Sequence, residues 1–285
     1  MMNRIMNNDA KEWKTKKVYY FSGTGNSYYV AKTISDALNA ELCPIVSIKE
    51  GDTIEGDLLG FVFPVYESKP PKIVTDTLKN SAGIKARRIF GIATYGVALS
   101  SALKRFEKTL SEKGGSLSLG YGIKSPVAMK PLGYTEEEST KLLSQAEEKI
   151  TRILEEIGSS TTGKIERTWI LENGAILRQL PTIVKLMRIL LFQGSKSLEF
   201  QATEDCIKCR LCERICPVGN IVWDKNAPVF GDRCTSCFGC IQWCPASAIQ
   251  FGIYGLNDLG IRNYHHPKVE AEDLIKGQSP RKEEM

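Results

Sequence analysis

The chain has 285 residues, 42% of them hydrophobic and 25% charged, and it carries a net charge of +5. This composition is typical of a globular protein, and the length is enough for two domains that each bury a core. The positive excess is too small and too diffuse to indicate nucleic-acid binding.

The first segment, residues 1–16, reads as a polar tail without the apolar core that a signal peptide requires. The longest apolar-rich stretch lies near residues 180–193. Lys185 and Arg188 interrupt it, and it is shorter than the ~20 residues that span a bilayer. We therefore expect a cytoplasmic protein without a transmembrane segment.

Residues 17–157 alternate between strand patterns and helix patterns. The predicted strands cover 17–21, 42–48, 58–64, 88–94 and 116–123, and the predicted helices cover 27–39, 71–79, 99–110 and 135–157. The last helix begins at a capping box formed by Thr135 and Glu138. Strands that alternate with helices predict an α/β domain, a doubly wound parallel sheet in the order 2-1-3-4-5 with helices on both faces.

Three further segments follow this domain. Residues 158–200 are predicted to be a connector with an amphipathic helix, residues 201–252 carry a cysteine repeat, and residues 253–285 form a C-terminal extension. The cysteine pattern is the only internal repeat that we find in the sequence.

The repeat consists of two runs, CIKCRLCERICP from Cys206 to Pro217 and CTSCFGCIQWCP from Cys234 to Pro245. In a reducing compartment such runs indicate metal ligands, not disulfides. Each run has the spacing C-x2-C-x2-C-x3-C-P. This spacing lets three thiolates hold three irons of one cubane, while the fourth cysteine points away and ligates the cluster of the other run.

Two [4Fe–4S] clusters are therefore expected. Their predicted ligands are Cys206, Cys209, Cys212 and Cys244 for one cluster, and Cys234, Cys237, Cys240 and Cys216 for the other. The alternative is a pair of structural zinc sites, but zinc has little use for the third cysteine or the proline. The ninth cysteine, Cys43, lies in a predicted buried strand, and we expect it to be a small core residue.

The two runs resemble those of the bacterial two-cluster ferredoxins, and the resemblance covers residues 203–252. It implies a small α+β domain. Trp223 and Trp243 lie close to the cysteines in the sequence, and we expect them to pack there and keep water off the sulfurs.

A second motif, FSGTGNS, follows the first predicted strand and opens a helix. Its glycines and hydroxyls suit a phosphate held by backbone N–H groups at the positive end of a helix. The alternative is a plain helix N-terminus. The expected phosphate ligands are Ser22, Gly23, Thr24, Gly25, Asn26 and Ser27.

Two more loops, PVYESKPP and TYGVALS, follow the third and fourth predicted strands. In the order 2-1-3-4-5 they meet the phosphate loop at the carboxyl edge of the sheet. Tyr66 and Tyr95 offer ring faces that could stack on a flat heterocycle. The loops therefore favour a flavin mononucleotide (FMN) site, with expected contributions from Pro64, Val65, Tyr66, Thr94, Tyr95 and Gly96.

The phosphate loop and the two aromatic loops resemble those of flavodoxins. Together with the cysteine runs, FPVYESKPP and IRNYHHPKV, they resemble the flavodoxin–ferredoxin fusion proteins of anaerobic bacteria and archaea over nearly the whole chain past residue 16. The resemblance implies a flavodoxin-like domain over 17–157. The segment SPVAMKPLGY, which follows the fifth strand, departs from the family pattern.

His265 and His266 are the only histidines, and we read them as surface or packing residues, with proton delivery as the alternative. The sequence contains no catalytic triad, no candidate acid–base pair and no second nucleotide-binding motif. This favours an electron carrier that works with a redox protein partner. The alternatives are an FMN-dependent reductase of a small substrate and a redox-sensing interaction protein, and a homodimer is left open.

Overall fold

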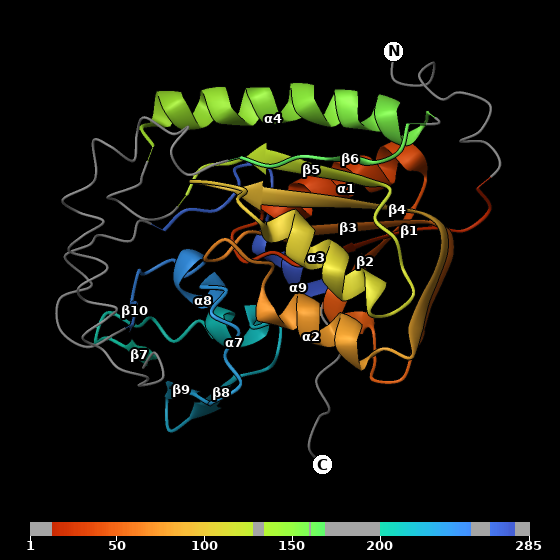
Figure 1. The fold of residues 1–285 in the computed structure, drawn as a ribbon. Coiled ribbons are helices and arrows are strands. Elements are labelled where there is room, and N and C mark those ends of the chain that lie inside the picture. The colour runs from red at the N-terminus through yellow and green to blue at the C-terminus, as the bar shows by residue number, and fades with distance from the viewer. Residues whose placement is uncertain (1–12, 128–133, 160, 169–199, 252–262, 277–285) are drawn as a thin grey trace.

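The computed structural model describes residues 13–127, 134–159, 161–168, 200–251 and 263–276 (Figure 1). The amphipathic helix predicted within the connector lies outside these residues, as does most of the N-terminal tail. In the described part, no helix combines the length and the apolar character that crossing a membrane requires.

A six-stranded sheet in which every pair of neighbours is parallel forms the first domain. Its strands lie in the order β2 (Glu41–Pro44), β1 (Lys16–Tyr20), β3 (Thr53–Pro64), β4 (Gly83–Tyr95), β5 (Leu119–Lys124) and β6 (Lys164–Ile165). The order confirms the predicted 2-1-3-4-5 arrangement, and the domain has a flavodoxin-like fold.

The strand bounds differ from the prediction in several places. Strands β3 and β4 begin at Thr53 and Gly83, five residues earlier than predicted, and β5 covers Leu119–Lys124 in place of 116–123. The second strand ends at Pro44 and continues as a 3-10 turn, η3 (Ile45–Ser47), whereas the prediction extended it to residue 48. Proline has no N–H to donate to the sheet, so the apolar residues after it leave the ladder. The sixth strand was not predicted, and it lies in the segment that the sequence analysis assigned to the connector.

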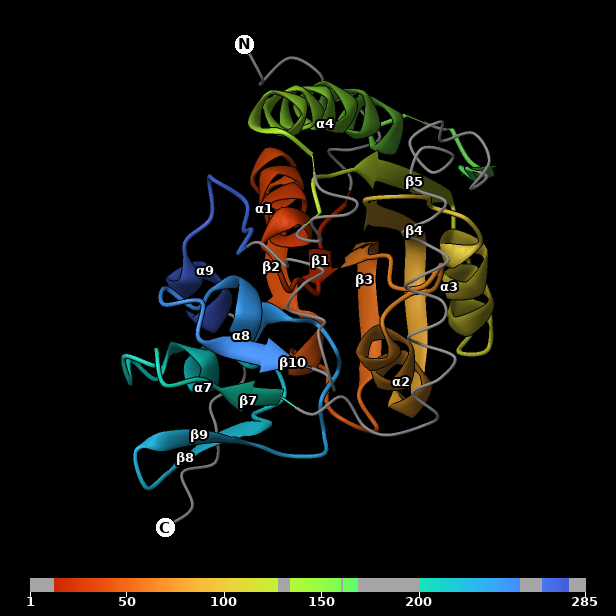
Figure 2. The same cartoon turned by 90° about the vertical axis from the view of Figure 1, so that its left-hand side faces the viewer.

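Helices cover both faces of the sheet (Figure 2). Helices α1 (Asn26–Leu38) and α4 (Glu136–Ile157) pack on one face, and α2 (Lys72–Asn80) and α3 (Ala102–Ser111) pack on the other. The predicted capping box of α4 is confirmed. The Thr135 side chain accepts a bond from the Glu138 N–H at 3.1 Å, and the Glu138 carboxylate accepts one from the Thr135 N–H at 2.8 Å.

The cysteine-bearing part, residues 200–251, is built from short elements. These are β7 (Phe200–Ala202), α7 (Leu211–Ile215), β8 (Ile221–Asp224), β9 (Ala227–Phe230), α8 (Gly239–Gln242) and β10 (Ile249–Phe251). Strands β7 and β10 pair antiparallel, as do β8 and β9. Its own small core holds Cys212, Ile221, Ile241 and Ile249.

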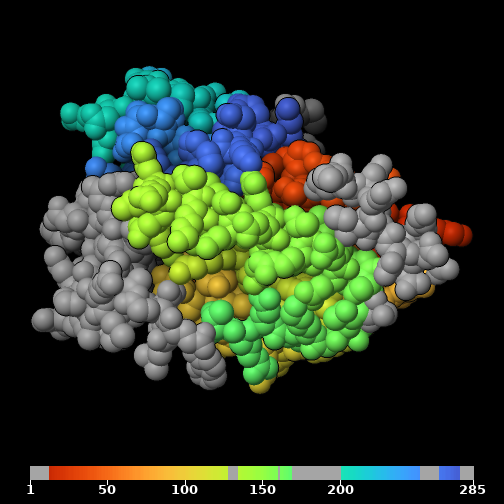
Figure 3. Space-filling model, turned by 90° about the horizontal axis from the view of Figure 1, so that it is seen from above, coloured from red at the N-terminus to blue at the C-terminus, as the bar shows by residue number. Residues whose placement is uncertain are grey.

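The cysteine-bearing part packs beside the carboxyl ends of the sheet strands (Figures 1 and 2). Ile215 and Trp243 enter the same apolar core as α1 and α4. Helix α9 (Ala271–Lys276) follows and buries Ala271 and Leu274 in that core too. In the view from above, the cysteine-bearing part and the C-terminal residues lie against the region of β5 and α4 without a gap (Figure 3).

Candidate cofactor sites

The two cysteine runs share one backbone conformation. The second and fourth residues after the first cysteine have positive φ angles in both runs: 59° at Lys208 and Arg210, and 53° and 57° at Ser236 and Phe238. Non-glycine residues seldom adopt this region. Its recurrence at matched positions shows that the sequence repeat is also a structural repeat.

The repeat continues at the fourth cysteine of each run. The backbone N–H of Asn220 points to the Cys216 sulfur at 3.2 Å, and that of Ala248 points to the Cys244 sulfur at 3.3 Å. Bonds from N–H groups stabilise negative charge on a thiolate. Both fourth cysteines are thus prepared in the same way to act as ligands.

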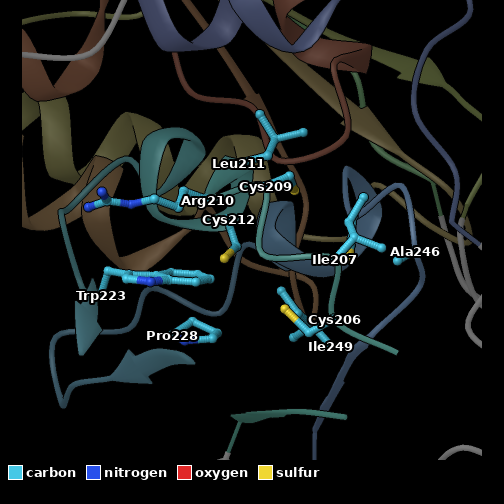
Figure 4. Close-up of a pocket in the computed structure, with 11 residues that line it drawn as sticks. Cys206, Ile207, Cys209, Arg210, Leu211, Cys212, Trp223, Pro228, Ala246 and Ile249 are labelled. Carbon is cyan, nitrogen blue, oxygen red and sulfur yellow. The ribbon is translucent and has the colours of Figure 1, made fainter. Parts of the chain in front are cut away.

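The fourth cysteine of the second run lies with the first run. A small hollow on the cysteine-bearing part is lined by Cys206, Cys209, Cys212 and Cys244. Trp223 and Pro228 line the same hollow (Figure 4). The pKa of the Cys212 thiol is raised to about 11, mainly by burial, and the neighbouring Cys209, Cys244 and Cys206 contribute to this increase. These four thiols are one of the two predicted ligand sets.

The fourth cysteine of the first run lies with the second run. The pKa of Cys237 is raised to about 11, mainly by burial, and the neighbouring Cys216 and Cys234 contribute to this increase. The pKa of Cys240 is raised well above its ordinary value by burial and by the same three thiols. The structure therefore brings together Cys234, Cys237, Cys240 and Cys216, the second predicted set.

The donor chemistry of both groups fits a multi-iron cluster. Four thiols and no imidazole or carboxylate make up each group, as [4Fe–4S] ligation requires. Across the described ranges, no three His, Cys, Asp or Glu side chains converge closely enough to hold a single metal ion. Ligands of a cubane bind different irons and stand farther apart than the ligands of one zinc ion.

The loop at the end of β1 forms an open helix N-terminus. Gly25 has a φ of 88°, which favours glycine, and its N–H donates to the Ser22 hydroxyl oxygen at 3.0 Å. The first helical bond of α1 runs from the Tyr29 N–H to the Gly25 carbonyl, so the N–H groups of residues 26–28 have no partner within the helix. The first turn carries no acidic residue. This end of α1 suits an anion such as a phosphate.

The three predicted loops meet at the carboxyl edge of the sheet. The hydroxyls of Ser27 and Thr94 are 2.8 Å apart and buried, and the Thr94 carbonyl accepts a bond from the Val65 N–H at 2.8 Å. The Asn26 amide donates to the Pro126 carbonyl at 3.1 Å, which adds the segment after β5. Residues from four separate parts of the chain are thereby fixed around the start of α1.

The two predicted tyrosines have different neighbours. Tyr66 is half-buried near Cys237, and the removal of its hydroxyl from water raises its pKa well above the ordinary value. Tyr95 ends β4 and packs over Gly122, where a Cβ atom would lie 2.9 Å from the Tyr95 ring. Pro64 ends β3 next to the loop of Tyr66.

The loop after β4 has a neighbour that the sequence analysis did not identify. The Tyr134 hydroxyl donates to the Gly96 carbonyl at 2.9 Å, and Val127 packs so closely on Gly96 that a Cβ atom there would lie 1.8 Å from it. Both residues belong to the segment that departs from the family pattern. The aromatic side chain of Tyr134 was the one feature of this segment from which the contact could have been predicted.

The phosphate loop and the second cysteine run are in direct contact. A Cβ atom at Gly23 would lie 2.2 Å from the Cys237 carbonyl oxygen and 3.2 Å from the Tyr66 hydroxyl. The buried Trp243 indole N–H donates to the Gly23 carbonyl at 2.9 Å. Only glycine leaves the space for this approach, so Gly23 serves the contact between the two sites.

A C-terminal strap, residues 263–266, ties both sites together. The Tyr264 hydroxyl donates to the Asn26 side-chain oxygen at 2.8 Å, and the His266 N–H donates to the Thr24 carbonyl at 2.8 Å. At its other end the Asn263 amide donates to the Cys244 carbonyl at 2.6 Å. The strap therefore fixes the cysteine-bearing part against the phosphate loop.

Both histidines of the strap pack against aromatic rings, which agrees with their interpretation from the sequence as surface or packing residues. His265 stacks on Trp243 with ring centroids 4.2 Å apart, and the buried His266 stacks on Tyr29 at 4.1 Å. Burial lowers the pKa of His266 to about 4, so this imidazole is uncharged at neutral pH. Trp243 packs as expected, and no pattern in the sequence indicates its bond to the phosphate loop.

No known family model matches the chain. Among curated proteins it is similar to one component of the ion-translocating oxidoreductase complex of Methanosarcina acetivorans, with 41% identity over 46 residues. This match covers 16% of the chain and 17% of that protein's length.

Solved structures resemble about half of the chain or less. A flavoprotein in complex with FMN from Lactobacillus acidophilus is 17% identical, with a TM-score of 0.30, over 38% of this chain and 93% of that one. Two-electron reduced Megasphaera elsdenii flavodoxin is 15% identical, with a TM-score of 0.31, over 48% and 99%. An azoreductase from Bacillus anthracis is 11% identical, with a TM-score of 0.35, over 50% and 100%.

Proposed function

We propose that the protein transfers electrons between a redox protein partner and an FMN, through two [4Fe–4S] clusters of its own. The observation that carries this proposal is the contact between the two sites. Gly23 of the phosphate loop touches the backbone of Cys237 and accepts a bond from Trp243. Separate cofactor functions would not need this contact.

The chemistry of the two kinds of group is complementary. A bound cubane transfers one electron at a time, and a bound flavin exchanges one or two. The chain contributes the arrangement. In this proposal the group of Cys234, Cys237, Cys240 and Cys216 is the inner one, since it adjoins the phosphate loop. The group of Cys206, Cys209, Cys212 and Cys244 is the outer one.

Side chains around the inner group exclude water. Trp243 is 7% exposed, Gly239 is buried, and the Tyr66 hydroxyl would lie 3.2 Å from a Cβ atom at Gly23. Low polarity and fixed dipoles determine reduction potentials in such sites. Here they also keep the electron path between the two sites free of solvent.

The outer group offers a surface for a partner. Cys209 is exposed and Ile207 beside it is 64% exposed, one of three large hydrophobic side chains that are exposed in the described ranges. The exposure of Cys209 brings the outer group close to the protein surface, where a docked partner can reach it. We propose that a redox protein docks here and exchanges electrons with the outer group.

Cofactor analysis after anaerobic purification tests this function. We expect about eight iron and about eight labile sulfide per chain, because each cubane holds four of each, and one FMN without the adenine dinucleotide form. Zinc in place of iron, with no labile sulfide, would contradict the proposal.

A variant of the phosphate loop tests the flavin site by itself. Gly25→Val places a branched side chain at a φ of 88° and within 3.3 Å of Val269 and His266. We expect the variant to lose its flavin and keep its iron. If the flavin content stays unchanged, the phosphate site lies elsewhere.

A substrate screen separates the carrier from the reductase. The chain is reduced chemically, small molecules are added one at a time, and flavin reoxidation is followed without a partner protein. If the protein is a carrier, its flavin is reoxidised slowly by every small molecule tested. Fast and saturable reoxidation by one compound would identify a reductase.

A further inference from the structure

A buried hydroxyl of the second cysteine run has no partner. The Thr235 Oγ1 atom is shielded from solvent and makes no hydrogen bond in the described part of the chain. Thr235 stands between Cys234 and Cys237 in the chain, and both of these cysteines belong to the inner group. A buried hydroxyl without a hydrogen bond is unfavourable, so an acceptor is expected at this place.

The matched position of the first run has no such donor. Ile207 follows Cys206 as Thr235 follows Cys234, and it is 64% exposed. The backbones agree directly after this position, as the φ angles of 59° at Lys208 and 53° at Ser236 show. At this matched position the second run thus has a buried hydrogen-bond donor, whereas the first run has an exposed alkyl group.

We infer that the Thr235 hydroxyl donates a hydrogen bond to a sulfur of the inner group and raises its reduction potential above that of the outer group. The inference rests on the proposed function. The reduction adds one electron to the group, and no bond breaks and no proton moves. The reduced form carries one more negative charge, so a donor stabilises it more than the oxidised form, and burial strengthens the effect.

A higher potential at the inner group gives electron flow a direction. Electrons that a partner delivers to the outer group would collect at the inner one, which adjoins the phosphate loop through Cys237 and Gly23. The difference in reduction potential that follows from Thr235 in one run and Ile207 in the other would thus favour electron transfer toward the flavin.

The test is a redox titration of both groups, followed by electron paramagnetic resonance, in the full chain after anaerobic purification. Thr235→Val removes the hydroxyl and keeps the shape. We expect it to change the reduction equilibrium of one group about tenfold toward the oxidised form, which is 59 mV for a one-electron couple. Thr235→Ser keeps a donor and should retain most of the original potential.

The matched control is Ile207→Thr, which adds a hydroxyl at the corresponding exposed position. Water competes for it there, so neither potential should move appreciably. If Thr235→Val assembles poorly, Thr235→Ala provides the same comparison in a smaller side chain. Full iron content with two unchanged potentials in these variants would overturn the inference, whereas a wild type without labile sulfide would overturn the proposed function instead.

Discussion

The two cysteine runs have the same spacing and the same backbone conformation, yet they lie in different surroundings. The first run carries exposed side chains at Ile207 and Arg210 and lines a hollow that opens to solvent. The second run places Cys237 and Gly239 against the loop of Gly23. Ligand spacing determines what a run can bind, while the neighbouring domain determines what the bound group can exchange electrons with.

This difference also separates two kinds of residue. Cysteines that hold a cluster are required in both runs. Residues that join the cysteine-bearing part to the phosphate loop are required only for the position of the second run. The clearest of these residues are Gly23, Trp243 and His266. Substitutions of the two kinds should therefore differ in what they remove and in how much.

The largest effect is expected from the crossed cysteines. Cys216→Ala should remove the inner group, and Cys244→Ala should remove the outer group, since each lies with the other run. Iron content should fall from about eight to about four per chain in either variant. If Cys216→Ala instead removed the group of Cys206, Cys209 and Cys212, the crossing would be wrong.

A smaller loss is expected at Gly23. A methyl group there would lie 2.2 Å from the Cys237 carbonyl oxygen, so Gly23→Ala forces the domains apart and should lower the free energy of unfolding by about 1–3 kcal/mol. Gly83→Ala is the matched control, because its nearest neighbour would be an ordinary contact at 3.7 Å. Denaturant unfolding measures both, and equal effects would contradict a close contact at Gly23.

The two tryptophans allow the same comparison at a similar magnitude. Trp243→Phe leaves the buried Gly23 carbonyl without its donor and should cost about 1–3 kcal/mol. Trp223→Phe loses a contact with Arg210, whose guanidinium lies 5.7 Å from the ring, and should cost less than about 1 kcal/mol. The unfolding free energies of the two variants give the ranking, and the reverse order would count against the described interface.

The smallest effect is a pH dependence in the strap. The folded pKa of His266 is about 4, below its ordinary value of 6.5, so the unfolded chain binds the proton more readily. Stability from this residue is complete above about pH 6.5 and is lost as the pH falls toward 4.

The measurement is the unfolding free energy at pH 7 and at pH 5. Between pH 7 and pH 5 the unfolding free energy of the wild type should fall by about 1–2 kcal/mol more than that of His266→Gln, because glutamine cannot become charged. The Glu147 carboxylate, whose pKa is lowered by Lys268 and Tyr29, is present in both chains and largely cancels in the difference. An equal loss in the two chains would show that His266 is not buried as described.

Local patterns in the sequence were enough to predict much of the first domain. The strand order followed from alternating strands and helices, and the capping box of Thr135 placed the start of α4. The same kind of reasoning failed after Pro44, because a short apolar run does not distinguish a strand from a turn.

Contacts between the first domain and the cysteine-bearing part, with its strap, could not be predicted. The bond from Trp243 to Gly23 joins residues 220 positions apart, and the sequence pattern of either residue is explained without it. The hydroxyl of Tyr264 likewise reaches Asn26 only because the strap returns to the start of α1. Such contacts depend on how the finished domains pack, which no local periodicity records.

The central claim is that electrons reach the flavin through both groups in sequence. Stopped-flow mixing with a reduced bacterial ferredoxin, a donor too large to enter the domain interface, tests it in the wild type, Cys216→Ala and Cys244→Ala. Flavin content is measured first and should be equal in all three. We predict that the wild type reduces its flavin after its clusters, and that both variants fail to reduce it at a comparable rate. Flavin reduction at the wild-type rate in either variant would contradict the relay.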